Sequence, residues 1–157
     1  MNKNEIMHMI DRSLFASLGY IGTDGQPNIR RVFCVWHKGL GAHLISTNTA
    51  SEHVTALLQS GRACLYFSDD EAFTGVCLYG TVSAHFEPEY RELLWNPGDE
   101  KYYPGGVTDP DYCVLEFVAD SARYYRADGK GTLTKSELAA FDAGKTYENG
   151  YAKTHAD

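Results

Sequence analysis

Residues 27–53 read PNIRRVFCVWHKGLGAHLISTNTASEH, and this stretch decides the fold. Residues 28–37 are rich in β-forming side chains, KGLG (38–41) supplies turn residues, and residues 42–47 form a second apolar run. Thr49-Ala50-Ser51-Glu52 then matches a capping box, in which a hydroxyl caps a helix and a carboxylate follows three residues later. The stretch therefore predicts two strands of an antiparallel meander and then a short helix that begins near Thr49.

The same alternation of β-rich runs and turns continues on both sides of this stretch. Apolar residues at helical spacing predict a helix over residues 4–13, and the turn TDGQ (23–26) joins a strand over 14–22 to the run at 28–37. Pro88 favours the first turn of another helix. Further strands are predicted over residues 62–68, 74–86, 112–118 and 122–126. Because the strands outnumber the helices and follow in hairpin order, we expect a mainly β fold, a closed or half-closed antiparallel barrel with helices at its edges.

The length of the chain, 157 residues, is typical of one compact domain. We therefore expect residues 1–157 to form a single domain, with a core over about 13–126 and a short helix and tail over 127–157. The sequence leaves open whether residues 145–157 pack on another subunit or stay mobile.

The segment DGKGTLTKSEL (128–138) resembles the second part of an EF-hand calcium loop. Arg126 and Lys130 occupy loop positions where calcium needs oxygen ligands, so a calcium site is not expected. We interpret the segment as a glycine-rich turn, followed by a capping box from Thr134 to Glu137 that opens a short helix.

Charge and composition argue against several kinds of partner. The formal net charge is −7 and the pI is about 5.3, so the chain would repel nucleic acid. No run approaches the roughly 20 apolar residues of a membrane span, and the N-terminus lacks the apolar stretch of a signal peptide, so we expect a cytoplasmic protein.

The histidines lack metal-ligand spacing, and the acidic run 69–71 is typical of a solvated turn, so no metal site is expected. The cysteines form no Cys-x-x-Cys pair and are interpreted as reduced, buried thiols: Cys34, Cys64, Cys77 and Cys113.

The polar residues of the opening stretch suit a phosphate group. Arg30 can donate a forked pair of hydrogen bonds, and Thr47, Asn48 and Ser51 place short polar side chains before a helix. The amides and the dipole at the helix start add donors that favour an anion. His53 could add a partial positive charge. Taken alone, these residues leave open whether they bind phosphate or only cap a helix.

The chain also resembles the FMN-binding signature of the pyridoxamine 5′-phosphate oxidase superfamily over about residues 13–126. The resemblance lies in PNIRRVF (27–33), LISTN (44–48), SEH (51–53) and YGTV (79–82), and is greatest to the short branch of general-stress and nitroimidazole-resistance-like proteins. It implies a split β-barrel homodimer that binds one FMN at each subunit interface. The residues that it assigns to the phosphate are Arg30, Thr47, Asn48, Ser51 and His53, and those near the flavin ring are Arg31, Val32 and Phe33.

Several positions depart from this family pattern. His53 stands where the family usually has a phosphate-binding lysine, so FMN affinity is expected to fall as pH rises. Val35 replaces a lysine of the oxidase, and Gly75 stands near a glutamine that usually touches the flavin. The oxidase's C-terminal Arg-x-Trp element has no clear counterpart. Pyridoxamine phosphate is therefore not the expected substrate.

The aromatic residues of the loop-rich segment after Pro88 can either pack in a core or line a pocket. We expect Trp95 to pack in the dimer core, and Tyr102 and Tyr103 to line the pocket above the flavin.

The leading hypothesis is an FMN-dependent oxidoreductase that transfers electrons from a reduced nicotinamide or flavin to a small acceptor. Two alternatives remain open at this point: a non-catalytic flavin-binding or stress protein, and a split-barrel dimer that has lost flavin.

Overall fold

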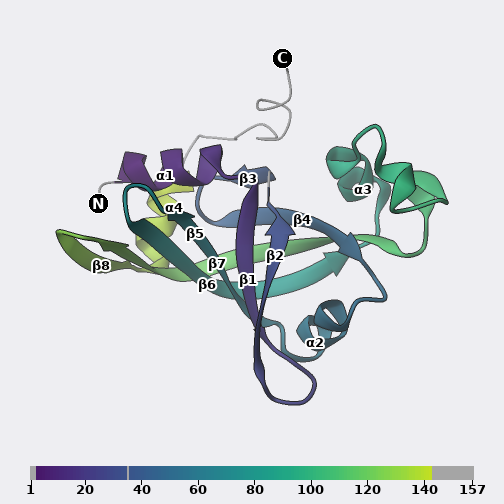
Figure 1. The fold of residues 1–157 in the computed structure, drawn as a ribbon, viewed down its shortest axis with the longest axis horizontal. Helices are drawn as coiled ribbons and strands as arrows, with labels where there is room; N and C mark the ends of the chain where they lie inside the picture. The colour runs from purple at the N-terminus through teal and green to yellow at the C-terminus, as the bar shows by residue number, and fades with distance from the viewer. Residues whose placement is uncertain (1–2, 35, 143–157) are drawn as a thin grey trace.

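The computed structural model describes residues 3–34 and 36–142, which form one curled antiparallel sheet with helices at its edges (Figure 1). The strands are β1 (Phe15–Ile21), β2 (Pro27–Phe33), β3 (Trp36–Lys38), β4 (Ala42–Asn48), β5 (Arg62–Asp69), β6 (Thr74–His85), β7 (Tyr112–Arg126) and β8 (Gly129–Leu133). The helices are α1 (Lys3–Arg12), α2 (Glu52–Ser60), α3 (Pro88–Leu94) and α4 (Lys135–Asp142), with 3-10 turns η1 (Asp99–Lys101) and η2 (Gly106–Thr108).

The sheet follows the order β2-β1-β5-β6-β7-β4-β3, and β8 pairs with β7. It curls so far that β2, at one end of this order, comes into contact with β4 near the other end. One cause is a register shift between β6 and β7 at Tyr79 and Gly80. Gly80 lies so close to the carbonyl of Val118 that no side chain fits there. The result is the expected mainly β fold, an antiparallel split β-barrel.

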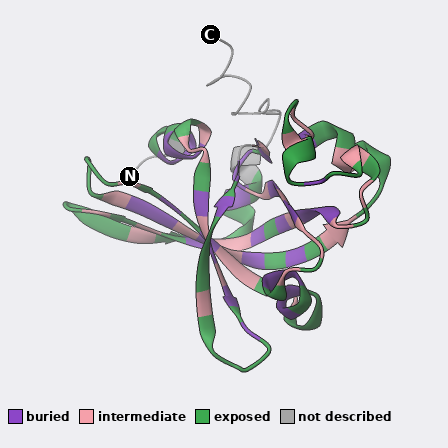
Figure 2. Ribbon diagram, turned by 45° about the vertical axis from the view of Figure 1, so that its right-hand side comes forward, coloured by how far each residue is buried: buried purple, intermediate pink, exposed green. Residues whose placement is uncertain are grey.

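The core fills the inside of the curled sheet. Buried residues alternate with more exposed ones along β1, whereas β7 begins with four consecutive buried residues, 112–115, because hydrophobic clusters cover both of its faces there (Figure 2). Helix α1 covers one opening of the barrel with Ile6 and Ile10. A second, smaller cluster joins α3 to β4 and β7 and consists of Leu44, Leu94, Tyr103, Tyr112 and Val114.

Several predicted elements are confirmed. The hairpin before residue 34 forms as β1 and β2, and Pro88 occupies the first turn of α3. The capping box at the start of α4 also forms: the Glu137 backbone N–H donates to Thr134 Oγ1 at 3.3 Å, and the Thr134 backbone N–H donates to Glu137 Oε1 at 3.2 Å.

Three predicted boundaries are wrong. The single strand expected over residues 28–37 is two strands, β2 and β3, because the chain leaves the β1 pairing after Phe33. The two strands expected at 112–118 and 122–126 are one strand, β7, because the bulge accommodates the irregular residues without ending the ladder. The glycine-rich turn after Asp128 continues into β8, which pairs with β7.

Residues 145–157, whose packing the sequence left open, lie outside the described residues, as does Val35. Within residues 3–34 and 36–142, no helix is long and apolar enough to cross a membrane.

Candidate functional site at the barrel seam

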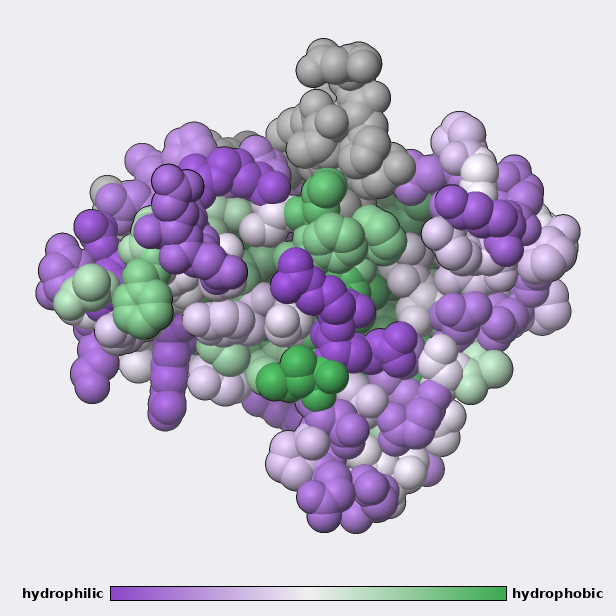
Figure 3. All heavy atoms as spheres, in the orientation of Figure 1, coloured by the Kyte–Doolittle hydropathy of each residue, from purple (hydrophilic) through white to green (hydrophobic). Residues whose placement is uncertain are grey.

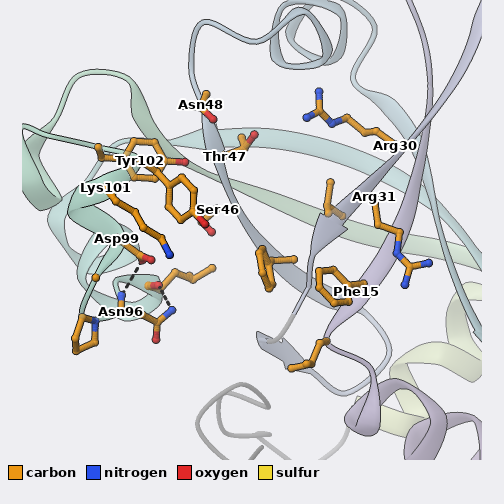
Figure 4. Close-up of a pocket in the computed structure, with 17 residues that line it drawn as sticks. Phe15, Arg30, Arg31, Ser46, Thr47, Asn48, Asn96, Asp99, Lys101 and Tyr102 are labelled. Carbon is orange, nitrogen blue, oxygen red and sulfur yellow. Dashed lines mark hydrogen bonds between the residues drawn. The ribbon is translucent and has the colours of Figure 1, made fainter. Parts of the chain in front are cut away.

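A groove with a volume of about 610 Å³ follows the seam where β2 approaches β4, and the loop after α3 forms its opposite wall (Figure 4). Arg30, Arg31, Val32 and Phe33 line it from β2, and Thr47 and Asn48 line it from β4. These six were predicted as site residues from the sequence, and the seam brings them to one cavity. The size falls in the range of small-molecule and cofactor sites, about 300–1,000 Å³.

Strand β2 forms one wall of the groove with an open edge. In the described part of the chain it pairs only with β1, so its other edge carries backbone N–H and C=O groups with no strand beside them. The curl of the sheet brings this edge toward the end of β4. The seam can therefore offer backbone donors and acceptors to a planar ligand, in addition to side chains.

A chain of three side chains joins β2, α2 and β4 behind the groove. Arg30 Nη1 donates to Nδ1 of His53 at 2.6 Å, and Nε2 of His53 lies 2.8 Å from Oγ1 of Thr47. Because a guanidinium can only donate, Nδ1 of His53 must accept, and the neutral ring then carries its proton on Nε2. His53 thus donates to Thr47, and the hydroxyl proton of Thr47 is left to point elsewhere.

His53 is fully buried and neutral in this arrangement. Burial, and secondarily the charge of Arg30, lower its pKa from 6.5 to about 4. The expectation that His53 adds positive charge near neutral pH is therefore wrong, because one ring nitrogen already accepts from a cation and the ring is out of water. His53 instead orients Arg30 and Thr47, the two groups on either side of it.

The turn between β4 and α2 is held by Asp111, which the sequence analysis missed. Its carboxylate accepts from the Ala50 backbone N–H and from Asn48 Nδ2, both at 2.9 Å. Its backbone carbonyl accepts from the Thr49 N–H at 2.7 Å. These hydrogen bonds lower the pKa of Asp111, the one with the Asn48 side chain most. No local pattern pointed to Asp111, because it lies far from the turn in sequence.

The capping box predicted at Thr49 does not form, and this is a further correction. Helix α2 begins at Glu52 with Ser51 as its N-cap, and Ser51 makes no side-chain capping bond. Glu52 instead accepts from the Tyr20 hydroxyl at 2.9 Å and from the Thr23 N–H at 3.3 Å. The Thr49 N–H, which a capping box would donate to Glu52, donates to the Asp111 carbonyl instead.

The predicted site residues therefore separate into two groups. Arg30, Arg31, Val32, Phe33, Thr47 and Asn48 line the groove, whereas Ser51 and His53 do not. Ser51 marks the start of α2, and His53 lies behind Arg30 and Thr47.

The opposite wall comes from the loop after α3. Tyr102 is 62% exposed, and the Lys101 ammonium lies 4.9 Å from the centre of its ring. Both line the groove together with Tyr103, as Figure 4 shows for the two labelled residues. The two tyrosines therefore line the groove, and their predicted place above a flavin stays a prediction. Trp95 packs against Tyr112 of the same chain with ring centres 5.2 Å apart, and its predicted place in a dimer core stays a prediction.

The fold and the groove define a split-barrel protein with a cationic cleft at the barrel seam. The model of the pyridoxamine 5′-phosphate oxidase-like family matches residues 16–148, so the chain belongs to that family. No functionally curated protein matches it.

Solved structures agree with this family. A protein from Clostridium acetobutylicum related to general stress protein 26 of Bacillus subtilis, described as of the pyridoxinephosphate oxidase family, is 35% identical, with a TM-score of 0.78 over 88% of this chain and 99% of that one. General stress protein 26 from Bacillus anthracis is 16% identical (TM-score 0.70, 84% and 97% covered). A pyridoxamine 5′-phosphate oxidase-related, FMN-binding protein from Nostoc punctiforme is 12% identical (TM-score 0.65, 82% and 86% covered). The last two show a shared fold.

Proposed function

We propose that the groove binds FMN, with its phosphate at Arg30 and Thr47. The observation that carries this proposal is the chain Arg30–His53–Thr47, in which a neutral histidine fixes an exposed arginine and leaves a hydroxyl proton free to donate. A cation and an oriented hydroxyl on facing strands suit a phosphate dianion, which accepts several charge-assisted hydrogen bonds. The FMN-binding relative from Nostoc punctiforme supports the same ligand.

The rest of the groove fits the remainder of FMN. The rings of Phe15 and Phe33 lie 4.8 Å apart beside the β2 edge, and Arg31 lies over Phe15 at 5.2 Å. Aromatic faces and an open strand edge suit a planar heterocycle that needs both stacking and backbone hydrogen bonds. Asn48 fits the phosphate less well than the sequence implied, because its side-chain amide already donates to Asp111.

We further propose a homodimer that covers the outer face of β1 and β2. Ile29 is 79% exposed and Phe33 47% exposed on this face, next to the groove. Figure 3 shows hydrophobic side chains over these strands on both sides of a band of hydrophilic ones. Exposed apolar groups of this size beside a cofactor groove are typical of an interface between subunits. A second subunit on this face would also close the groove to water.

The activity that we propose is that of a cytoplasmic oxidoreductase. Bound FMN supplies two-electron transfer, from a reduced nicotinamide or flavin to a small acceptor. The chain's own residues bind the phosphate through Arg30 and Thr47, orient the ring along β2 and exclude water. Tyr102 and Lys101 on the opposite wall of the groove would contact the small electron acceptor.

The binding proposal is tested by titrating the purified protein with FMN and following the flavin absorption spectrum. Arg30→Ala removes a charge-assisted interaction of about 1.5–3 kcal/mol, so the dissociation constant should rise roughly tenfold to a hundredfold. Arg62→Ala is the matched control, since Arg62 is exposed and paired with Asp120 at 2.6 Å away from the groove. Thr47→Val should weaken binding and Thr47→Ser should not. Equal affinities across Arg30→Ala and Arg62→Ala would overturn the proposed phosphate site.

The oxidoreductase proposal has its own test. The FMN-loaded protein is mixed anaerobically with reduced nicotinamide, and saturable flavin reduction faster than that of free FMN is expected. Tight binding with reduction no faster than that of free FMN would identify a flavin-binding protein without catalysis. Absence of binding would identify a split barrel that has lost flavin.

A further inference from the structure

Two cysteines meet on the outer face of the sheet, away from the seam groove. Cys64 on β5 is directly opposite Tyr79 on β6, and Cys77 on β6 is directly opposite Tyr66 on β5. The two cysteines are therefore diagonal neighbours, and their side chains point to the same face of the sheet. Each of the two thiols therefore influences the pKa of the other.

The surroundings of the pair leave room for sulfur chemistry. Gly19 on β1 is directly opposite Cys64, and a side chain at Gly19 would collide with the Cys64 sulfur, whose distance from the position of a Cβ is only 2.6 Å. Arg123 on β7 is directly opposite Cys77 and brings a positive charge to the same face. Tyr79, on the same face, also influences the pKa of Cys77.

These contacts distinguish the pair from the other two cysteines. The neighbouring Cys77 thiol lowers the pKa of Cys64 to about 6, outweighing partial burial. The Cys64 thiol in turn raises the pKa of Cys77. Burial alone raises the pKa of Cys34 to about 12, and it is the main cause of the raised pKa of Cys113. A thiolate next to a second thiol is the arrangement of a nucleophilic cysteine and the resolving cysteine that forms a disulfide with it.

We propose that Cys64 and Cys77 are a redox-active dithiol that hydroperoxides convert to a cross-strand disulfide. The Cys64 thiolate attacks the peroxide O–O bond, forms a sulfenic acid and releases the other oxygen as water or an alcohol after protonation. The Cys77 sulfur then attacks the Cys64 sulfur, forming the S–S bond while the sulfenic oxygen leaves with the Cys77 proton as water. Two thiols are oxidised and one hydroperoxide is reduced.

Both cysteines are only partly buried, so a small oxidant can reach Cys64 as well as Cys77. Cys77 lines a second hollow, of about 600 Å³, together with Tyr66, Arg123, Tyr125 and Lys130. Diagonal neighbours in antiparallel sheets have Cα atoms about 7–8 Å apart, slightly more than disulfides usually span. Because β5 and β6 are already hydrogen-bonded neighbours, closing the bond must shift one strand along the other, and we expect the resulting strained disulfide to be readily reduced. This proposal does not depend on flavin binding.

The first experiment treats the full chain without FMN with limiting hydrogen peroxide, blocks the remaining thiols and maps the peptides without reduction. A Cys64–Cys77 disulfide that a dithiol reductant reverses is expected, with Cys34 and Cys113 still reduced. In Cys77→Ala, Cys64 should instead accumulate as the sulfenic and sulfinic acids. Equal oxidation of all four cysteines, or no Cys64–Cys77 disulfide, would overturn the proposal.

The second experiment measures alkylation of Cys64 by iodoacetamide as a function of pH, resolved by peptide. In the wild type the rate should level off above a midpoint of about 6. In Cys77→Ala the midpoint should rise toward the ordinary value of about 8.5, and at pH 6 the wild type should react about tenfold faster. Cys34→Ala is the matched control and should leave the profile unchanged. A wild-type midpoint near 8.5 would contradict the proposed thiolate.

Discussion

Arg30 on β2 and His53 on α2 are joined by a hydrogen bond of 2.6 Å, in which the guanidinium donates to Nδ1 of the ring. This bond holds the ring in its neutral form, with the proton on Nε2 facing Thr47. His53, which the sequence suggested as a possible cation, therefore accepts a hydrogen bond from a cation. The positive charge available to a ligand comes from Arg30, and His53 holds the Arg30 side chain in position.

The first prediction concerns the pH dependence of FMN binding. The pKa of His53 is about 4, so the ring stays neutral and contributes no change of charge between pH 7 and 8.5. The FMN phosphate is already a dianion in that range, its second pKa being about 6. We expect the dissociation constant to change by less than about twofold, as measured by flavin titration. A tenfold weakening across this range would instead mean that His53 is charged in the complex.

The second prediction concerns acid stability. Burial, and secondarily the nearby His37, lower the pKa of His43 from 6.5 to about 3. The unfolded chain therefore binds a proton that the folded chain does not, so this contribution to stability is complete above about pH 6.5 and is lost as pH falls toward 3. Between pH 7 and pH 5 the loss is about 2 kcal/mol.

The measurement is urea unfolding of the wild type and of His43→Phe at both pH values. His43 packs against Phe67 and Phe117, with ring centres 5.5 and 6.1 Å apart, so a phenyl ring suits the space. The variant should lose less stability on acidification, whatever its stability at pH 7. Identical pH slopes in the two proteins would assign acid sensitivity to other groups.

The third prediction concerns Asp111. Asp111→Ala releases the Ala50 N–H and the Asn48 amide, and it also removes a negative charge near the proposed phosphate site. Hydrogen bonds to a charged group contribute about 1.5–3 kcal/mol each, whereas repulsion between exposed charges in water is about 1 kcal/mol at 4 Å. We therefore expect looser turn residues and FMN binding weaker by about tenfold.

Hydrogen exchange of the turn amides and flavin titration check the Asp111 prediction together. Asp111→Asn should weaken binding less, because an amide oxygen can still accept from the Ala50 N–H. Tighter binding in both variants would show that repulsion of the phosphate outweighs the ordering of the turn.

The fourth prediction concerns the bulge that curls the sheet. At Gly80 a methyl group would collide with the Val118 carbonyl, and both are backbone-constrained by the β6–β7 ladder. Gly80→Ala should destabilise the protein by about 3 kcal/mol in urea unfolding. Gly129→Ala is the matched control, since no atom lies within 4 Å of its Cβ position, and its effect should stay within about 0.5 kcal/mol. Comparable losses in both variants would contradict the role given to Gly80.

Elements whose signals are local were predicted well from the sequence. The hairpin of β1 and β2, the proline-led start of α3 and the capping box from Thr134 to Glu137 depend on residues a few positions apart. The capping box expected at Thr49 has equally good local chemistry, but Asp111, just before β7, accepts from the Thr49 and Ala50 N–H groups instead. Local sequence patterns show which hydrogen bonds a segment can form, whereas partners that are distant in sequence decide which of those bonds form.

By itself, the sequence determined the mainly β fold, the strand alternation and the chemical groups available to an anion at Arg30 and Thr47. Only the tertiary structure decided which of those groups lie close together, because their distance depends on how far the sheet curls and so on the contact between β2 and β4. It also decided the protonation of His53, since a pKa depends on burial and on neighbours that are distant along the chain. Strand period and turn chemistry are properties of neighbouring residues, whereas desolvation and seam geometry arise only when the whole sheet has closed.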